Sequence, residues 1–129
     1  MLRIPDNVRF IGTMNTADRS IALVDHALRR RFAFLKLYPD YDILRSYHKR
    51  EATGFPVERL IDVIMDLNTK IADEDYEIGV SFFLHKDLER QIADIWCMEI
   101  EPYLEEYFFD QRPKVEEFRW DRISSKIMS

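Results

Sequence analysis

The beginning of the chain shows two short apolar runs on either side of an amphipathic segment. Residues 8–14 are apolar and β-favouring almost without interruption, which predicts a short, largely buried strand. Apolar residues recur at helical spacing through residues 20–31, which predicts a helix with one apolar face. Residues 32–37 predict a second strand, closed by Pro39. Strand, helix and strand at this spacing indicate a βαβ crossover with parallel strands.

Beyond Pro39 the apolar positions follow only the helical period. Asp40 is predicted to cap a helix that runs to about Arg50, and a second helix with one apolar face is predicted over about 56–72. The resulting fold class is mainly α with a small β part. We divide the chain into residues 1–39, the α/β piece, and residues 40–129, the helical piece.

Two prolines mark the expected helix boundaries in the last third of the chain. A third helix is predicted to begin near Lys86, and Pro102 is predicted to interrupt it. Proline lacks a backbone donor, and its ring clashes with the preceding turn. Pro113 is predicted to open a last helix towards the C-terminus.

The small predicted sheet cannot be self-sufficient. Two strands with one crossover helix leave apolar edges and faces uncovered. The sequence therefore predicts that the chain is part of a larger protein or that it completes itself by association.

Composition and charge narrow the class of protein. Of the 129 residues, 47% are hydrophobic and 33% are charged, and the net charge is −5. This balance indicates a soluble, globular protein and disfavours DNA or RNA binding through a broad basic surface. No apolar run approaches the roughly 20 residues that span a bilayer. The single cysteine, Cys97, allows no internal disulfide, which favours a reducing, cytoplasmic setting. Cys97 itself is interpreted as a buried inert thiol.

Two islands of sequence carry a resemblance to a known family. The segment MNTADRS at residues 14–20, followed by DHALRRRF at residues 25–32, resembles the part of AAA+ proteins that runs from sensor 1 to the arginine finger. Within that superfamily it is most similar to McrB, the motor subunit of modification-dependent 5-methylcytosine restriction systems. A second island, residues 79–83 and 102–110, resembles the helical lid of that family.

The resemblance implies roles for six residues, and each has a structural alternative. Asn15 is similar to sensor 1, which orients the attacking water, although an asparagine here also suits a turn. Asp18 is expected to orient water or to hold an arginine, or simply to cap the following helix. Arg30 and Arg31 resemble arginine fingers inserted into a neighbouring subunit, while the alternative is a basic helix end that complements the dipole. Backbone groups of two lid residues, Gly79 and Ser81, are expected to lie near the nucleotide.

Arg29 and the lid turn carry weaker functional expectations. Arg29 is interpreted only as a basic residue at the end of its helix. The McrB pattern has a histidine where this chain has Val80, and no sensor 2 arginine stands at the start of the lid helix. A structural turn followed by an aromatic core, Phe82 and Phe83, is therefore the favoured interpretation.

The chain lacks the sequence features that hold a triphosphate. It has no G-x-x-x-x-G-K-[ST] segment and no acidic pair ahead of Asn15 for Mg²⁺. The resemblance therefore implies the C-terminal part of a GTP- or ATP-hydrolysing motor, with nucleotide and Mg²⁺ bound only in the complete protein. Its implied partners are other AAA+ subunits in a ring and a McrC-like nuclease, with DNA contacted by other domains. The alternative is a non-catalytic module that docks on, or regulates, a full-length motor subunit.

Other candidates for chemistry have structural interpretations. The three histidines, His26, His48 and His85, show no spacing that pairs them as metal ligands. The aromatic residues of 103–109 are predicted to seal a helical core, because no basic residues interleave with them. The acidic runs at 73–77 and 105–106 are interpreted as solvated faces.

Overall fold

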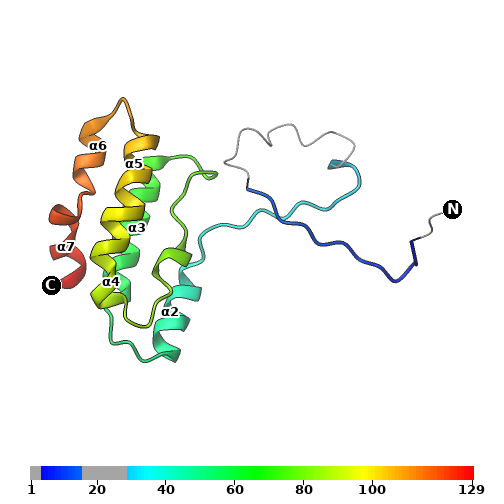
Figure 1. Ribbon diagram of the computed structural model, residues 1–129, viewed down its shortest axis with the longest axis horizontal. Coiled ribbons are helices and arrows are strands. Elements are labelled where there is room, and N and C mark those ends of the chain that lie inside the picture. Colours follow the sequence, from blue (N-terminus) through cyan, green and yellow to red (C-terminus); the bar gives the residue numbers. More distant parts are fainter. Residues whose placement is uncertain (1–3, 16–28) are drawn as a thin grey trace. The chain divides into compact units, whose positions relative to one another are not determined.

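Residues 36–129 form a helical body whose elements follow one another with short connections (Figure 1). The computed structural model describes residues 4–15 and 29–129, and the chain divides into a first unit, residues 1–35, and this helical body. The elements of the body are α2 (Tyr41–Arg50), α3 (Val57–Ile71), the 3₁₀ helix η2 (Val80–Phe83), α4 (Leu88–Ile95), the π-helix η3 (Trp96–Ile100), α5 (Glu101–Tyr107), α6 (Arg112–Glu117) and α7 (Trp120–Met128). The prediction of a mainly helical protein is confirmed.

The predicted strand pair is not shown. Across the two described stretches the structure contains no β-strand, and residues 8–14 and 32–37 have no ladder partner. Apolar side chains of these segments stay open to solvent; Ile11 is 96% exposed and Leu35 is 87% exposed. A strand forms only where another strand accepts its backbone hydrogen bonds, so two isolated segments of this kind gain no sheet by themselves. The predicted helix at 20–31 lies mostly outside the described residues.

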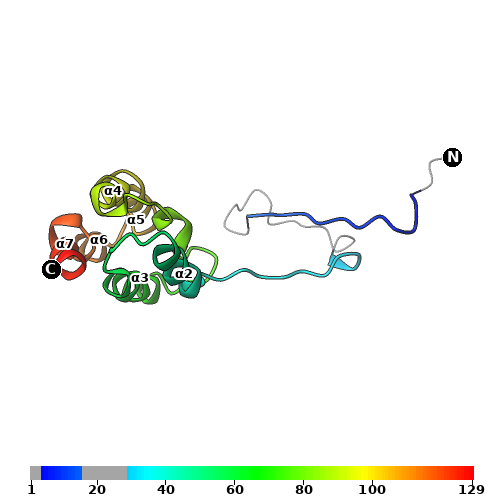
Figure 2. The ribbon, with the colours of Figure 1, turned by 90° about the horizontal axis from the view of Figure 1, so that it is seen from below.

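The core of the body lies between four groups of helices. Seen nearly end-on in Figure 2, α2, α3, the α4–α5 rod and the α6–α7 pair surround a common centre. The described buried apolar side chains all fall between Leu44 and Ile127. Helix α3 contributes Leu60, Ile64 and Leu67, spaced at i, i+4 and i+7, because that spacing places them on one face. The predicted apolar face of α3 is confirmed.

The turn between α2 and α3 uses the local signals that the sequence contains. Asp40 caps α2 by accepting a hydrogen bond from the Asp42 backbone amide at 2.9 Å, as predicted. Gly54 has a φ of +71°, a left-handed conformation that favours glycine, and Pro56 precedes the first residue of α3. The helix boundaries at Arg50 and near residue 56 are therefore confirmed.

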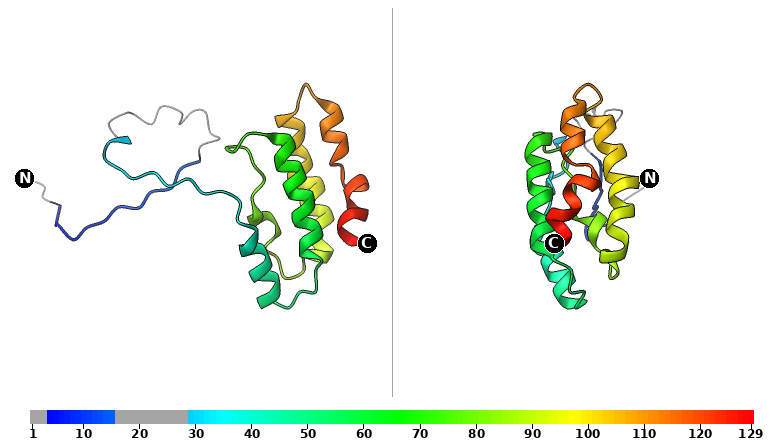
Figure 3. Two further views of the ribbon diagram at one scale, coloured as in Figure 1. Left: turned by 180° about the vertical axis from the view of Figure 1, so that it is seen from behind. Right: turned by 90° about the vertical axis from the view of Figure 1, so that its left-hand side faces the viewer.

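The prediction that Pro102 interrupts a helix is wrong. The chain stays helical from Leu88 to Tyr107, because the π-helix η3 lies just before the proline (Figure 3). The Glu101 amide donates to the Trp96 carbonyl, five residues back, so the wider turn shifts the hydrogen-bond register before Pro102. Pro102 falls in the first turn of α5, where a missing amide donor costs little.

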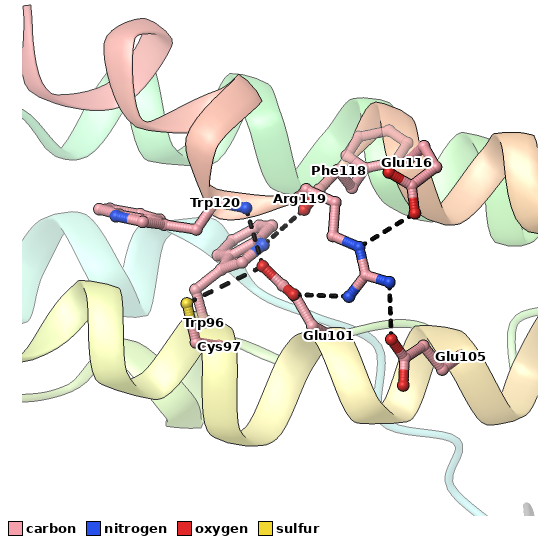
Figure 4. Close-up of polar contacts among 8 residues, drawn as sticks. All are labelled: Trp96, Cys97, Glu101, Glu105, Glu116, Phe118, Arg119 and Trp120. Atoms are coloured by element: carbon pink, nitrogen blue, oxygen red, sulfur yellow. Dashed lines mark hydrogen bonds and ion pairs between the residues drawn. The ribbon is translucent and has the colours of Figure 1, made fainter.

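The last predicted helix is divided into α6 and α7 by bonds from α5 and η3 (Figure 4). Pro113 lies in the first turn of α6 as predicted, but Arg119 has an extended backbone with a ψ of 145°. The Trp96 indole donates to the Phe118 carbonyl at 2.7 Å, and the Glu101 carboxylate accepts from the Trp120 amide at 2.8 Å. These two bonds replace helical hydrogen bonds at the break, so the helix can end and restart.

Candidate functional site

The predicted motor residues of the first unit are exposed where the structure describes them. Asn15, Arg30 and Arg31 are all exposed, and Asp18 lies outside the described residues. Arg29 is the last helical residue before a turn that holds Arg30 and Arg31. Gly79 and Ser81 belong to the helical body, so the structure assigns no common site to the two groups.

The second candidate, the Gly79–Ser81 turn, opens the 3₁₀ helix η2. Gly79 precedes the helix with an extended backbone, φ −81° and ψ 162°, that any residue adopts. A Cβ at this position would meet only the Ser81 Oγ, at 3.9 Å. Ser81 is exposed, whereas Phe83 is fully buried and Phe82 is half-buried. The predicted structural turn leading into an aromatic core is therefore confirmed.

Asn68 on α3 holds the backbone just before this turn. Its side-chain Oδ1 accepts from the Ile78 amide at 2.7 Å, and its Nδ2 donates to the Ile78 carbonyl at 3.1 Å. The same Nδ2 lies 3.3 Å from the Tyr41 hydroxyl. Asn68 is buried, so these bonds supply partners for a side-chain amide that burial would otherwise leave unsatisfied.

His48 on α2 holds the backbone at the other end of the turn. Its Nε2 lies 2.9 Å from the Phe83 carbonyl oxygen, and its Nδ1 lies 2.8 Å from the Thr53 hydroxyl. The ring is buried and lies against Phe55. The histidine therefore links α2, the turn before α3, and η2.

Side chains from α5 and a lysine fix the connector between α3 and the turn. The Tyr107 hydroxyl donates to the Ile71 carbonyl at 3.0 Å, and the Tyr103 hydroxyl donates to the Tyr76 carbonyl at 2.6 Å. Lys36 Nζ lies 2.9 Å from Glu74 Oε2 and 3.1 Å from Asp75 Oδ1. The interpretation of residues 73–77 as a merely solvated acidic run is therefore incomplete, because two of its carboxylates hold the lysine.

His48 and Asn68 were not predicted as structural residues, although the sequence contains a signal for them. His48 follows Leu44 by four positions, and Asn68 follows Ile64 by four positions. Each polar side chain therefore continues the buried face of its helix. A polar residue in such a position predicts a buried side chain that must find hydrogen-bond partners.

Cys97 and Phe109 lie outside the core, contrary to prediction. Cys97 is exposed, with its Sγ 3.9 Å from the Glu101 carboxylate. Partial burial and the Glu101 carboxylate raise the pKa of the Cys97 thiol, which disfavours the nucleophilic thiolate. Phe109, two residues after the end of α5, is 77% exposed, whereas Phe108 is buried.

Two classes of site find no support in the described ranges. No group of three or more His, Cys, Asp or Glu side chains there is placed to hold a metal ion. No helix in that part of the chain is both long and apolar enough to cross a membrane.

The helical body is a small α-helical lid domain of the type found in McrB. Residues 59–116, which lie within the helical body, match the family described as McrB, alpha-helical lid domain. The chain is also 40% identical, over 124 residues, to the Type IV methyl-directed restriction enzyme EcoKMcrB subunit of Escherichia coli (strain K12). That alignment covers 83% of this chain and 27% of the relative, so the chain spans about a quarter of the relative's length. No solved structure matches the chain significantly.

Proposed function

We propose that the chain supplies the sensor 1, arginine-finger and lid parts of a McrB-like AAA+ nucleotide-hydrolysing motor that drives DNA restriction. The observation that carries this proposal is the identity of 40% to the McrB subunit over 83% of the chain. An alignment of that length extends well outside the lid match at 59–116. The similarity therefore supports a role for more of the chain than the helical lid.

In this proposal Asn15 and Asp18 act on the attacking water. Phosphoryl transfer requires an oriented water and stabilisation of the charge that spreads over the phosphate oxygens. The neutral Asn15 amide can accept a hydrogen bond from water and donate one to a phosphate oxygen without adding charge. A carboxylate such as Asp18 can accept a second bond from the same water. The exposed position of Asn15 is compatible with this role.

Arg30 and Arg31 act on the nucleotide of a neighbouring subunit. A guanidinium group keeps its charge and presents several donors in one plane, which suits the oxygens of a departing phosphate. Both arginines are exposed and lie in a turn after the helical Arg29, so they are available to a second subunit. The implied assembly is a ring of AAA+ subunits.

Gly79 and Ser81 contribute the lid's contact with the nucleotide. Gly79 has no Cβ, which allows a ligand to approach its backbone closely, and Ser81 offers an exposed hydroxyl. These are neutral contacts, as expected for a lid with Val80 in place of a histidine. They position the nucleotide and supply no catalytic charge.

GTP or ATP with Mg²⁺ is the proposed cofactor, bound in the complete protein. The chain offers an amide, two guanidinium groups and a backbone turn, a donor set that fits a nucleotide's oxygens and base edges. It has no phosphate-binding loop, and its described residues offer no metal cluster. A McrC-like nuclease is the proposed partner, and DNA is contacted by other domains.

The proposal predicts that Arg30→Ala disables hydrolysis whereas Arg29→Ala does not. The chain is joined to, or mixed with, the nucleotide-binding portion of a McrB-type motor, and GTP and ATP hydrolysis are measured. Loss of a finger supplied in trans is expected to lower kcat by roughly 10³–10⁵-fold. Arg29→Ala is the matched control, because it removes a neighbouring arginine whose proposed role is structural.

A mixing experiment distinguishes a finger from an arginine needed for folding. Arg30→Ala subunits are combined with subunits whose phosphate-binding loop is inactivated. A finger acting in trans predicts recovery of hydrolysis, because an inactive-loop subunit can donate its Arg30 to an intact neighbouring site. Full hydrolysis by Arg30→Ala subunits alone would contradict the proposed role.

The alternative is an interaction module that docks on a full-length motor subunit. The observation in its favour is that the described core of the helical body is formed without the first unit. Under this alternative, no mixture with a nucleotide-binding portion hydrolyses GTP or ATP. Binding to an intact motor would then be unaffected by Asn15→Ala and Arg30→Ala.

A further inference from the structure

We infer that His48 and Asn68 are positioning residues that hold the Gly79–Ser81 turn ready for a nucleotide. The inference rests on the proposed function, because it assigns that turn to the nucleotide contact. It adds two side chains that touch neither nucleotide nor water in the reaction and act through the backbone at Ile78 and Phe83.

The buried polar side chains of the described residues bond to the two ends of this turn. In the described part of the chain, His48 and Asn68 are the two polar side chains in the buried class, at 4% and 7% exposure. Both bond to the short segment from Ile78 to Phe83, one at each end. A buried polar group costs free energy unless it is hydrogen-bonded. Because both side chains are hydrogen-bonded, each restrains the backbone atoms that it bonds.

The side-chain amide of Asn68 is complementary to the backbone donor and acceptor of Ile78. Its oxygen accepts from the Ile78 amide while its nitrogen donates to the Ile78 carbonyl, so one planar group satisfies both backbone atoms. Ile78 itself is 2% exposed, and its backbone has no water available as a substitute. Rotation of the chain at Ile78 would break both bonds at once, which fixes the entry to Gly79.

The hydrogen-bond partners of His48 determine which of its ring nitrogens donates. The Phe83 carbonyl can only accept, so Nε2 must carry the proton and donate. Nδ1 then accepts from the Thr53 hydroxyl, whose oxygen in turn accepts from the Phe55 amide at 3.3 Å. With the proton on Nε2, each of these bonds joins a donor to an acceptor. The imidazole ties the exit of the turn to the fixed loop before α3.

Between these anchors few side-chain bonds support the backbone of the turn. Gly79 receives no side-chain cap, and the Leu84 amide donates to the Ser81 carbonyl over a long 3.4 Å. The bonds from α2 and α3 therefore act together with the packing of Val80 and Phe83 in the core to hold residues 79–82. A turn fixed before binding loses less conformational entropy when a ligand contacts it, which strengthens binding.

Two substitutions of His48 separate positioning from general support. His48→Gln places an amide donor near the position of Nε2 and keeps a bond to Phe83, while His48→Asn places it near Nδ1 and keeps only Thr53. Hydrogen exchange of amides 78–84 is measured in the 129-residue chain. Exchange is expected to be about tenfold faster in His48→Asn and close to wild type in His48→Gln.

The assembled motor then provides a kinetic readout. With GTP and ATP as probes, His48→Asn is expected to raise KM about tenfold with kcat nearly unchanged, and His48→Gln is expected to rescue KM. Asn68→Leu tests the other anchor independently and is expected to act in the same direction. Thr69→Ala is its matched control, because Thr69 is exposed and bonds only the Met65 carbonyl of its own helix.

The outcomes distinguish the positioning inference from the proposed function. Equal exchange, or equal KM, for His48→Gln and His48→Asn, together with a wild-type KM for Asn68→Leu, would overturn the positioning inference alone. No hydrolysis by the wild-type assembly would overturn the proposed function, and the inference with it. A rise in KM for His48→Asn and Asn68→Leu, without a rise for His48→Gln or Thr69→Ala, supports both.

Discussion

At the scale of single residues, the tyrosines of α5 show how side chains replace secondary structure in the connector. Residues 72–79 form no helix, and the hydroxyls of Tyr107 and Tyr103 donate to the carbonyls of Ile71 and Tyr76. Burial first, and then the neighbouring Tyr107, raises the pKa of Tyr103 from 10 to about 12. A neutral phenol is therefore favoured in the folded protein.

This shift predicts an alkaline loss of stability that depends on Tyr103. A group whose pKa is raised on folding contributes stability that is complete below its unfolded pKa of 10 and is lost as the pH rises to about 12. Urea unfolding measured on either side of pH 10 is expected to show a smaller alkaline loss in Tyr103→Phe than in wild type. Tyr38→Phe, at an exposed position, is the control. Identical pH dependence in wild type and Tyr103→Phe would contradict the prediction.

The roles of several single residues could not be predicted from the sequence. Asn15, Arg30 and Gly79 were selected because they stand in a motif, and their roles remain predictions. His48 and Asn68 were missed because their importance depends on the carbonyls and amides they meet, which lie 35 and 10 positions away along the chain. Cys97 was expected in the core, but it lies on an exposed face of η3.

At the scale of elements, the helix bounds that follow from amphipathic periodicity and caps were predictable. α2 and α3 begin and end near the predicted positions, because Asp40, Gly54 and Pro56 mark those positions locally. The prediction of a helix break at Pro102 failed because the π-helix before it removes the clash between the proline ring and the preceding turn. The break at Phe118–Arg119 could not be predicted, because Trp96 and Glu101, far away in sequence, satisfy its backbone groups.

The α6–α7 break predicts unequal effects for two neighbouring glutamates. Glu101 bonds both Arg119, at 2.7 Å, and the Trp120 amide, and its side chain is 14% exposed. Glu101→Ala is expected to destabilise the protein by about 2 kcal/mol, because it removes charge-assisted bonds and the cap of α7. Glu105 bonds Arg119 alone and is 53% exposed, so Glu105→Ala is expected to cost under about 1 kcal/mol. Urea unfolding measures both, and equal losses would contradict the assignment of the cap to Glu101.

At the scale of the whole molecule, the described core belongs to the helical body alone. The buried apolar residues begin at Leu44, eight positions into the body. Residues 36–129 are therefore expected to fold without residues 1–35. Circular dichroism of this shorter chain is expected to show a melting temperature within a few degrees of the 129-residue chain. A loss of cooperative melting would show that the first unit stabilises the body.

The exposed apolar segments predict self-association of the chain. Ile11, Leu35 and Leu37 are 96%, 87% and 90% exposed, and such apolar runs with unpaired backbone favour pairing with another chain. Sedimentation is expected to show mass increasing with concentration, and Ile11→Lys with Leu35→Lys is expected to reduce it. Met65→Lys, at an exposed position on α3, is the control for added charge. A monomer at high concentration would contradict the prediction.

The salt bridges of Lys36 give the chain a mechanical property. Lys36 is the first residue of the helical body, and its ammonium group grips Glu74 and Asp75, only a few residues before Gly79. Motion of the polypeptide at residue 35 would therefore act on the approach to the Gly79–Ser81 turn through these two ion pairs, as well as on α2 through the backbone.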